Sequence, residues 1–234
     1  MRHGEFLTII QDQCAALRAA AVAAGPDTDV PTCPKWTVNR LVRHIGRVQS
    51  WVGKALAGAP DRQADQPPSD WAELLSWWDE QRVKMLDGLA DPDAPAWLPF
   101  AGYPPFAGSW ARRQAHEAAI HRLDAEHALT PTPSVVFPPE FAADGIDELI
   151  TVLVPGRDDW SGSRFEGTVI LRATDAGREW NVRLAPGVPP APGAGAPDLT
   201  IEGSADAVYR RVWGRPSVAV VAGEVALLEP LASP

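Results

Sequence analysis

Residues 115–127 read AHEAAIHRLDAEH, with three histidines and three acidic residues on an alanine-rich background. Alanine is the strongest helix former, so this segment predicts a helix. Its first part, HEAAIH, is close to the zinc-protease motif but is one residue longer. His116 and His121 are five positions apart, so their directions on a helix differ by roughly 140°. The two histidines cannot easily reach one ion, and the protease interpretation fails on geometry.

Glu117 and His121 form a different pair. They are four positions apart, which places both side chains on one helix face, together with Gln114 and Asp124. A carboxylate and an imidazole at this spacing can bind one divalent cation, but two ligands do not make a site. The same spacing also fits an ordinary exposed ion pair. A metal site would need a third ligand from another helix.

His44, in the segment LVRHIGRVQSW, is the candidate for this third ligand. It lies at the edge of an apolar stripe that includes Leu41 and Val48, so its ring is expected to face a bundle interior. His44, Glu117 and His121 would form a two-histidine, one-carboxylate set with open positions, which is typical of a catalytic metal. A hydrogen-bonded histidine at the edge of the core is the alternative.

Other candidate groups are weaker. His3, His116 and His127 are expected at the surface rather than as ligands. Cys33 lies in a turn off the predicted ligand face and is interpreted as structural rather than nucleophilic. Trp51, close to His44, either packs between helices or forms a wall of a ligand pocket.

Composition excludes several classes of protein. With 234 residues and 45% hydrophobic residues, the chain is expected to fold with a substantial core. A net charge of −9 argues against nucleic-acid binding. No window approaches the ~18 apolar residues of a membrane span, and Gln11 and Asp12 interrupt the N-terminal apolar run of a possible signal peptide. Two cysteines make no disulfide framework. We expect a cytoplasmic protein without a nucleic-acid or membrane partner.

Periodicity predicts helices over most of the first two thirds of the chain. Apolar spacing indicates four long helices: over residues 4–24, after the N-cap Thr37, after the N-cap Asp70, and from Ser109 to before Thr130. Four such helices can bury each other's apolar stripes as a bundle. A further helical stretch runs from Phe141 to Leu153.

From about residue 160 the pattern alternates instead. The segment TVILRATDAGREWNVRLA predicts a hairpin that pairs Val169–Leu171 with Trp180–Leu184. Residues 186–197 form a loop, DLTIEG a strand, Ser204 the start of a short helix, and EVALLEP a last strand. The chain is therefore predicted to be an α+β protein, with a helical bundle over residues 1–156 and a small α+β domain over residues 157–234.

Several segments together resemble one family. CPKWTVNRLVRHIGRVQSW (33–51) and WARRQAHEAAIHRLDAEHA (110–128) are most specific, and ADGIDELITVL, PDLTIEGSADAVYRRVWGR and GEVALLEPL add to them. They resemble the mycothiol-dependent maleylpyruvate isomerase family, in which a DinB-like four-helix metalloprotein bundle precedes a small sterol-carrier-like α+β domain.

This resemblance implies that His44, Glu117 and His121 bind a divalent metal, typically zinc. It also implies that mycothiol, an actinobacterial thiol, supplies the reactive sulfur; beyond the metal-bound thiol, the sequence assigns no catalytic residue. A metal can lower the pKa of a bound thiol. In an isomerase the thiolate would add to an electron-poor cis double bond, the new single bond would rotate, and elimination would return the thiol. A thiol S-transferase would stop at the conjugate.

An anionic substrate such as a dicarboxylate would need cationic partners. Arg40 and Arg47 share the His44 side of their helix, and Arg215 could approach from the second domain; solvated surface arginines are the alternative. Two further functions stay open. One is a non-catalytic, metal-stabilised protein that binds a small molecule, and the other is a metal-dependent hydrolase, whose activity would need no thiol.

Overall fold

The computed structural model describes residues 1–59, 63–157 and 159–232, which form two compact units. We call Arg2–Pro99 with Pro104–Val135 the bundle unit. The sheet unit holds Met1, Phe100–Tyr103 and Val136–Pro234.

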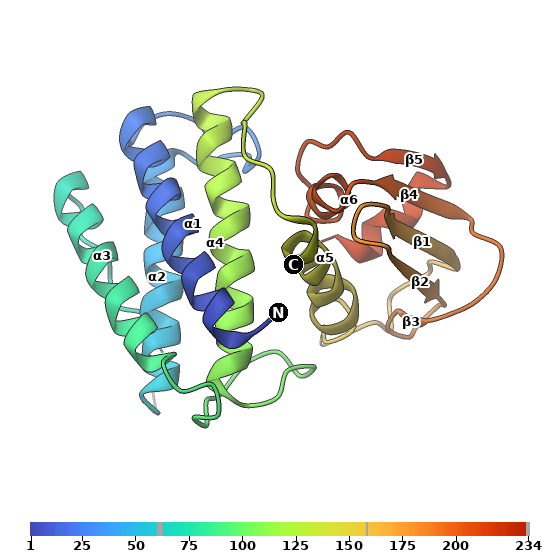
Figure 1. The fold of residues 1–234 in the computed structure, drawn as a ribbon, viewed down its shortest axis with the longest axis horizontal. Helices are drawn as coiled ribbons and strands as arrows, with labels where there is room; N and C mark the ends of the chain where they lie inside the picture. The colour runs from blue at the N-terminus through green and yellow to red at the C-terminus, as the bar shows by residue number, and fades with distance from the viewer. Residues whose placement is uncertain (60–62, 158, 233–234) are drawn as a thin grey trace. The chain divides into compact units, whose positions relative to one another are not determined.

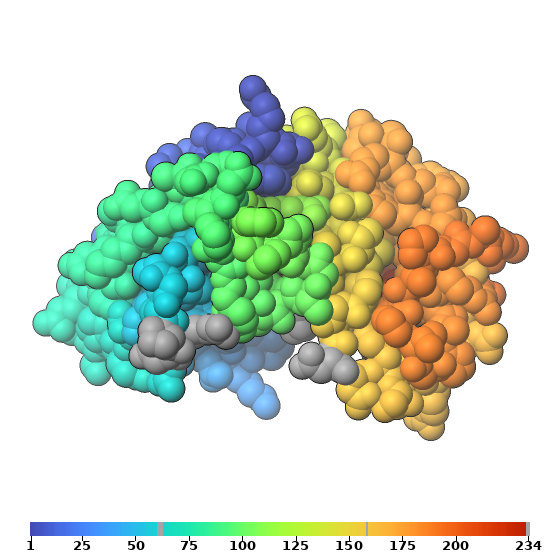
Figure 2. Space-filling model, turned by 90° about the horizontal axis from the view of Figure 1, so that it is seen from below, coloured from blue at the N-terminus to red at the C-terminus, as the bar shows by residue number. Residues whose placement is uncertain are grey.

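Four long helices make up the bundle unit, as predicted (Figure 1). Helix α1 packs along α4, α2 packs along α3, and α2 also contacts α4. Their bounds are α1 His3–Ala24, α2 Val38–Leu56, α3 Trp71–Gly88 and α4 Ala107–Leu129. Residues 90–99, of which five are exposed, connect α3 to α4 and are drawn in green in Figure 2.

Side-chain caps start two of these helices where the sequence predicts. The Thr37 hydroxyl accepts a hydrogen bond from the Arg40 backbone N–H at the start of α2, and the Asp70 carboxylate accepts one from the Glu73 N–H at the start of α3. One face of α2 is buried through apolar residues, and the remaining face carries its arginines. This division lets α2 contribute to the core and to the surface at once.

Helix α4 is the most buried of the four, with fifteen buried residues among its 23. It begins at Ala107, two residues before the predicted cap Ser109. Its many alanines lack bulk, so neighbouring helices can approach closely. Burial therefore extends to polar positions of α4 as well as to apolar ones.

The sheet unit contains a five-stranded sheet of order β3-β2-β1-β4-β5 (Figure 1). The predicted hairpin is confirmed: β1 and β2 are antiparallel, with Val169 opposite Val182 and Leu171 opposite Trp180. β1 and β4 are parallel, and β4 and β5 are antiparallel. The bounds are β1 Gly167–Ala173, β2 Arg178–Leu184, β3 Ala191–Pro192, β4 Leu199–Gly203 and β5 Val220–Gly223.

Helices cover this sheet and continue its core. Helix α6 (Ala205–Val212) is capped by Ser204 and contacts β1 and β4. Helix α5 (Pro139–Glu148) and the π-helical turn η1 (Leu149–Leu153) precede the sheet, and α5 packs on α6 through Phe141 and Tyr209, whose rings lie 6.1 Å apart. The structure thus groups α5 with the sheet, whereas the predicted boundary after residue 156 grouped it with the bundle.

The predicted last strand, EVALLEP, is wrong. Val225–Leu231 forms the 3₁₀ helix η2, and the last strand is the preceding β5. The buried residues of η2 are Leu227, Pro230 and Leu231, a spacing of three to four rather than the two of a strand. Pro230 also lacks the N–H that a strand would need.

The α+β fold class, a four-helix bundle followed by a small α+β part, is confirmed. Among the described helices, none combines the length and the apolar character needed to cross a membrane.

Candidate functional site

Three predicted ligand residues meet inside the bundle unit. His44 comes from α2, and Glu117 and His121 come from successive turns of α4. The Oε1 atom of Glu117 lies 3.1 Å from His44 Nε2 and 3.3 Å from His121 Nε2. The two imidazole rings are 4.8 Å apart and nearly perpendicular. The two helices therefore bring together two ring nitrogens and one carboxylate oxygen, although 73 residues separate His44 from Glu117 in the sequence.

Burial and charge set the protonation of this group. Burial alone would raise the pKa of Glu117, but hydrogen bonds with His121 and His44 and the charge of Arg113 hold this pKa well below its usual range. Burial alone would lower the pKa of His121, but hydrogen bonds with Asp124 and Glu117 raise it to about 9. Without a cation, His121 is therefore in its charged, protonated form at neutral pH, between the carboxylates of Glu117 and Asp124.

The donor set fits a divalent cation. One ligand atom from each of His44, Glu117 and His121 lies within 4.8 Å of the other two, so a single small ion can contact all three. Two imidazoles and one carboxylate match the set of a catalytic zinc, which leaves positions for a ligand. A cation bound to this set would also take the place of the proton on His121 Nε2, which faces Glu117.

A second set of groups meets at the other ring nitrogen of His121. Asp124, fully buried, places Oδ2 2.9 Å from His121 Nδ1 and 3.4 Å from the Cys33 sulfur. The Thr32 hydroxyl donates to Asp124 Oδ1 over 2.6 Å. The sequence placed Asp124 on the Glu117 face but did not indicate its contacts with Thr32 and Cys33, because 91 or 92 residues separate them.

Trp36 covers both histidines. Its ring lies 5.0 Å from the His44 ring and 6.1 Å from the His121 ring, nearly parallel to the latter. The Arg40 guanidinium lies over the ring of this tryptophan, 5.4 Å from the ring centroid. The loop before α2 therefore supplies the wall of the site as well as the contacts to Asp124.

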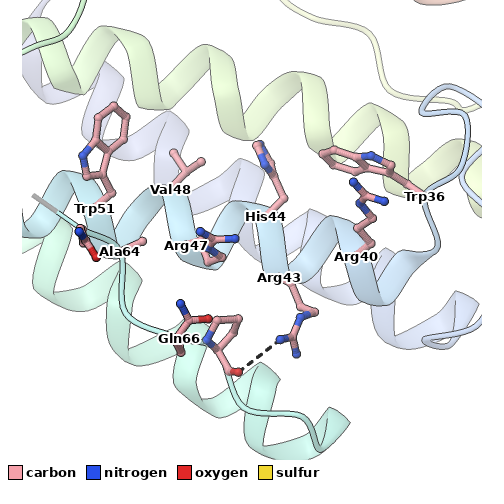
Figure 3. Close-up of a pocket in the computed structure, with 11 residues that line it drawn as sticks. Trp36, Arg40, Arg43, His44, Arg47, Val48, Trp51, Ala64 and Gln66 are labelled. Atoms are coloured by element: carbon pink, nitrogen blue, oxygen red, sulfur yellow. Dashed lines mark hydrogen bonds between the residues drawn. The ribbon is translucent and has the colours of Figure 1, made fainter.

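A pocket of about 940 Å³ opens beside His44. Figure 3 shows His44 pointing from α2 toward α4, and Arg43 pointing toward the segment after α2. Among the described residues no carboxylate lines the pocket; its lining consists of Trp36, Arg40, Arg43, His44, Arg47, Val48, Trp51, Gln63, Ala64, Gln66 and Pro67. The pocket is cationic, although the whole chain carries a net charge of −9.

The three arginines of this pocket differ in their partners. Arg43 donates to the backbone carbonyls of Pro67 and Pro68, and Arg40 covers Trp36. Arg47 makes no hydrogen bond or ion pair with any residue that the structure describes. Of the pocket arginines, Arg47 is the one that keeps its charge available for a ligand.

The other predicted residues have separate outcomes. Trp51 packs edge-on against Trp97 and Trp110, as one of the two alternatives predicted, and it also lines the pocket. Its role as a wall for a bound ligand stays a prediction. Arg215 belongs to the sheet unit, where its guanidinium donates to the Trp213 carbonyl. Its role toward a substrate stays a prediction.

The expectation that the remaining histidines lie at the surface is wrong for two of them. His116 is fully buried, 6.4 Å from the Phe6 ring, and His127 is also buried. Both α1 and α2 contact α4, so a histidine that points away from the Glu117 face still meets a neighbouring helix. His3 is half-buried, with Nε2 2.8 Å from the Leu89 carbonyl oxygen.

Comparison with known proteins places these features in context. Family models match residues 7–126, as the mycothiol maleylpyruvate isomerase N-terminal domain, and residues 140–230, as the MDMPI C-terminal domain. No curated protein gives a significant match.

Two solved structures are also similar, that of the mycothiol-dependent maleylpyruvate isomerase and that of its histidine-to-alanine mutant. Their TM-scores are 0.61 and 0.63, at 16% and 14% identity, and each match covers 96% of this chain and 95% of the other. At such low identity these two likenesses support the fold alone.

Proposed function

Because the chain belongs to the mycothiol-dependent maleylpyruvate isomerase family, we propose that it is a metal- and thiol-dependent enzyme that acts on a small electrophile. The supporting observation is the convergence of His44, Glu117 and His121 at the edge of a cationic pocket. The similar structures, of one isomerase and its mutant, are named as mycothiol-dependent, so mycothiol is the proposed thiol cosubstrate.

In this proposal His44, Glu117 and His121 hold the cation, and zinc is the metal that best matches their donor set. When bound, a divalent cation supplies the positive charge that lowers the pKa of a neighbouring thiol. Arg113, with Nη2 3.2 Å from Glu117 Oε2, keeps that carboxylate ionised and oriented. Trp36 excludes water from one side of both histidines.

The substrate proposed for this pocket is an electrophile that carries a carboxylate. Arg47 offers an unpaired guanidinium, which is suited to bind a carboxylate through two parallel hydrogen bonds. Arg215 is proposed as a further cationic partner. The isomerase and transferase reactions share these requirements and differ in whether the thiol leaves again after addition.

The proposal is tested first by metal content. Freshly purified protein is expected to contain near-stoichiometric zinc or another divalent metal, which His44→Ala loses. His3→Ala is the matched control, because His3 binds a backbone carbonyl outside the set and its loss should leave the metal in place. Absence of metal from the wild-type protein would remove the basis of the catalytic proposal.

A second measurement separates the functions. Purified protein is assayed on a panel of electrophiles, including cis-dicarboxylates, with and without mycothiol. Turnover that depends on mycothiol supports the proposal, and the product, a trans isomer or a thiol conjugate, distinguishes isomerase from transferase. Turnover without any thiol would instead assign a hydrolase, and metal binding without any turnover would assign a binding protein.

A further inference from the structure

His121 presents its two ring nitrogens to two different carboxylates. Nε2 lies 3.3 Å from Glu117 Oε1, on the side of His44, whereas Nδ1 lies 2.9 Å from Asp124 Oδ2. A neutral imidazole has one N–H and one lone pair, so only one of the two nitrogens can bind a cation while the other donates. The hydrogen-bond partner of Nδ1 therefore decides which ring nitrogen is available to bind a cation.

Asp124 is held in place by groups that the cation set does not include. It is fully buried, and both of its oxygens have partners: Oδ1 accepts from the Thr32 hydroxyl, and Oδ2 lies near the Cys33 sulfur and His121 Nδ1. Thr32 and Cys33 both act as donors toward this side chain, so its oxygens serve as acceptors. The oxygen that faces Nδ1 is therefore placed to accept a hydrogen bond from the ring.

We propose that Asp124 is a positioning residue, which fixes the proton of His121 on Nδ1 and leaves the Nε2 lone pair toward Glu117 and His44. The inference rests on the proposed function, because it assumes that His121 binds the cation. A carboxylate behind a metal-binding histidine orients the ring and raises its basicity, and its loss typically weakens metal affinity about 10- to 100-fold. Thr32 and Cys33 act one step further out, as donors that orient Asp124.

The arrangement also gives Cys33 a role that is not nucleophilic. Its sulfur lies 3.4 Å from the Asp124 carboxylate, so a thiol there donates a weak hydrogen bond. The group Cys33, His121 and Asp124 has itself the composition of a metal set. A cation bound there would need the Nδ1 lone pair of His121, which is the opposite tautomer. The two sets therefore exclude each other for a neutral His121.

The test is the zinc affinity of Asp124→Asn, measured by competition with a chromogenic chelator. Asparagine keeps the shape but can present an N–H to Nδ1, so we expect affinity to fall about 10- to 100-fold. Glu126→Gln is the matched control on the same helix, since Glu126 pairs with Arg122 at 2.7 Å rather than with the site. Thr32→Val should weaken affinity less than Asp124→Asn.

A second readout separates positioning from a loss of folding. In zinc-loaded wild-type protein, the Nδ1 proton of His121 should be visible by NMR as a downfield, slowly exchanging resonance, which Asp124→Asn should lose while its circular dichroism is unchanged. Unchanged zinc affinity in Asp124→Asn would overturn the inference and leave the proposed function intact. Loss of zinc from Cys33→Ala but not from His44→Ala would place the cation in the alternative set and also overturn it. Absence of zinc from the wild-type protein would overturn both.

Discussion

The two compact units bury polar groups in different ways. In the bundle unit, α4 alone buries six polar or charged residues, namely Arg113, Gln114, His116, His121, Asp124 and His127. The sheet unit buries three among its described residues, namely Glu148, Thr168 and Arg210. Its network around Arg172 on β1 is exposed, because Arg172 pairs with Glu179 and Glu202, each about two fifths exposed.

This difference bears on the stability of the bundle unit. Burying a charge is costly unless a partner and hydrogen bonds compensate for the lost water, so a core of apolar side chains would be the simpler solution for α4. The sheet unit uses that solution, with Leu171, Ile201 and Tyr209 fully buried. Departures from it are expected at functional sites. In this chain Arg113 contacts Glu117 and Asp124 contacts His121, whereas His116 lies on another side of α4.

The largest expected effect comes from breaking the buried network. Glu117→Gln in metal-free protein removes the charge that compensates Arg113 and the protonated His121, so we expect the free energy of unfolding to fall by about 3 kcal/mol. Glu179→Gln removes one charge from the exposed network of the sheet unit, where water screens the interaction, and should leave the unfolding midpoint unchanged. Chemical denaturation with a chelator present measures both.

If Glu117→Gln and Glu179→Gln lowered the free energy of unfolding by similar amounts, the contrast between the two units would be contradicted. Such a result would mean that the Glu117 network is as well solvated as the exposed network of Arg172. A stabilised Glu117→Gln would contradict it more strongly. It would show that the buried carboxylate is unfavourable even with both of its cationic neighbours in place.

Much of the fold could be predicted from local patterns. The four long helices follow from helical apolar spacing, two of their N-termini from Thr37 and Asp70, and the hairpin from alternation on either side of a glycine turn. The wrong last strand shows the limit of such patterns. Leu227 and Leu231 are four residues apart, a spacing that places them on one side of either a strand or a helical turn. In so short a segment, packing decides between the two.

The site was predictable where helix geometry applies. The spacing of Glu117 and His121 and the position of His44 on its apolar edge identified three groups that the fold brings within 4.8 Å. The contacts of Asp124 with Thr32 and Cys33 were not predictable, because they join a loop to a helix that lies 91 or 92 residues further along the chain. The burial of His116 and His127 was missed for a related reason, since no local pattern reveals that α4 has neighbours on several sides.

A comparable effect is expected from pH, again confined to the buried network. In metal-free protein the pKa of His121, which faces Glu117 and Asp124, is raised from 6.5 to about 9. The stability that this proton contributes is complete below pH 6.5 and is lost as the pH rises through 9, a loss of about 3 kcal/mol. Unfolding measured from pH 6 to 10 with a chelator should show this loss, and His121→Gln should remove it. A flat profile in the wild type would mean that His121 is neutral in the folded state.

The smallest expected effect concerns the arginines, and it separates binding from folding most cleanly. Arg47→Gln removes a cation that has no partner among the described residues, so the free energy of unfolding should change by less than about 0.5 kcal/mol. If the proposed function holds, KM for a carboxylate-bearing electrophile should rise about tenfold, equivalent to about 1.4 kcal/mol, with kcat nearly unchanged, because the lost contact is made in both ground and transition state.

KM for an uncharged electrophile should not change, and Arg172→Gln, in the sheet unit, should leave both constants as they are. An equal rise for charged and uncharged substrates would mean that Arg47 shapes the pocket rather than binding the anion, and its charge would then need a different explanation.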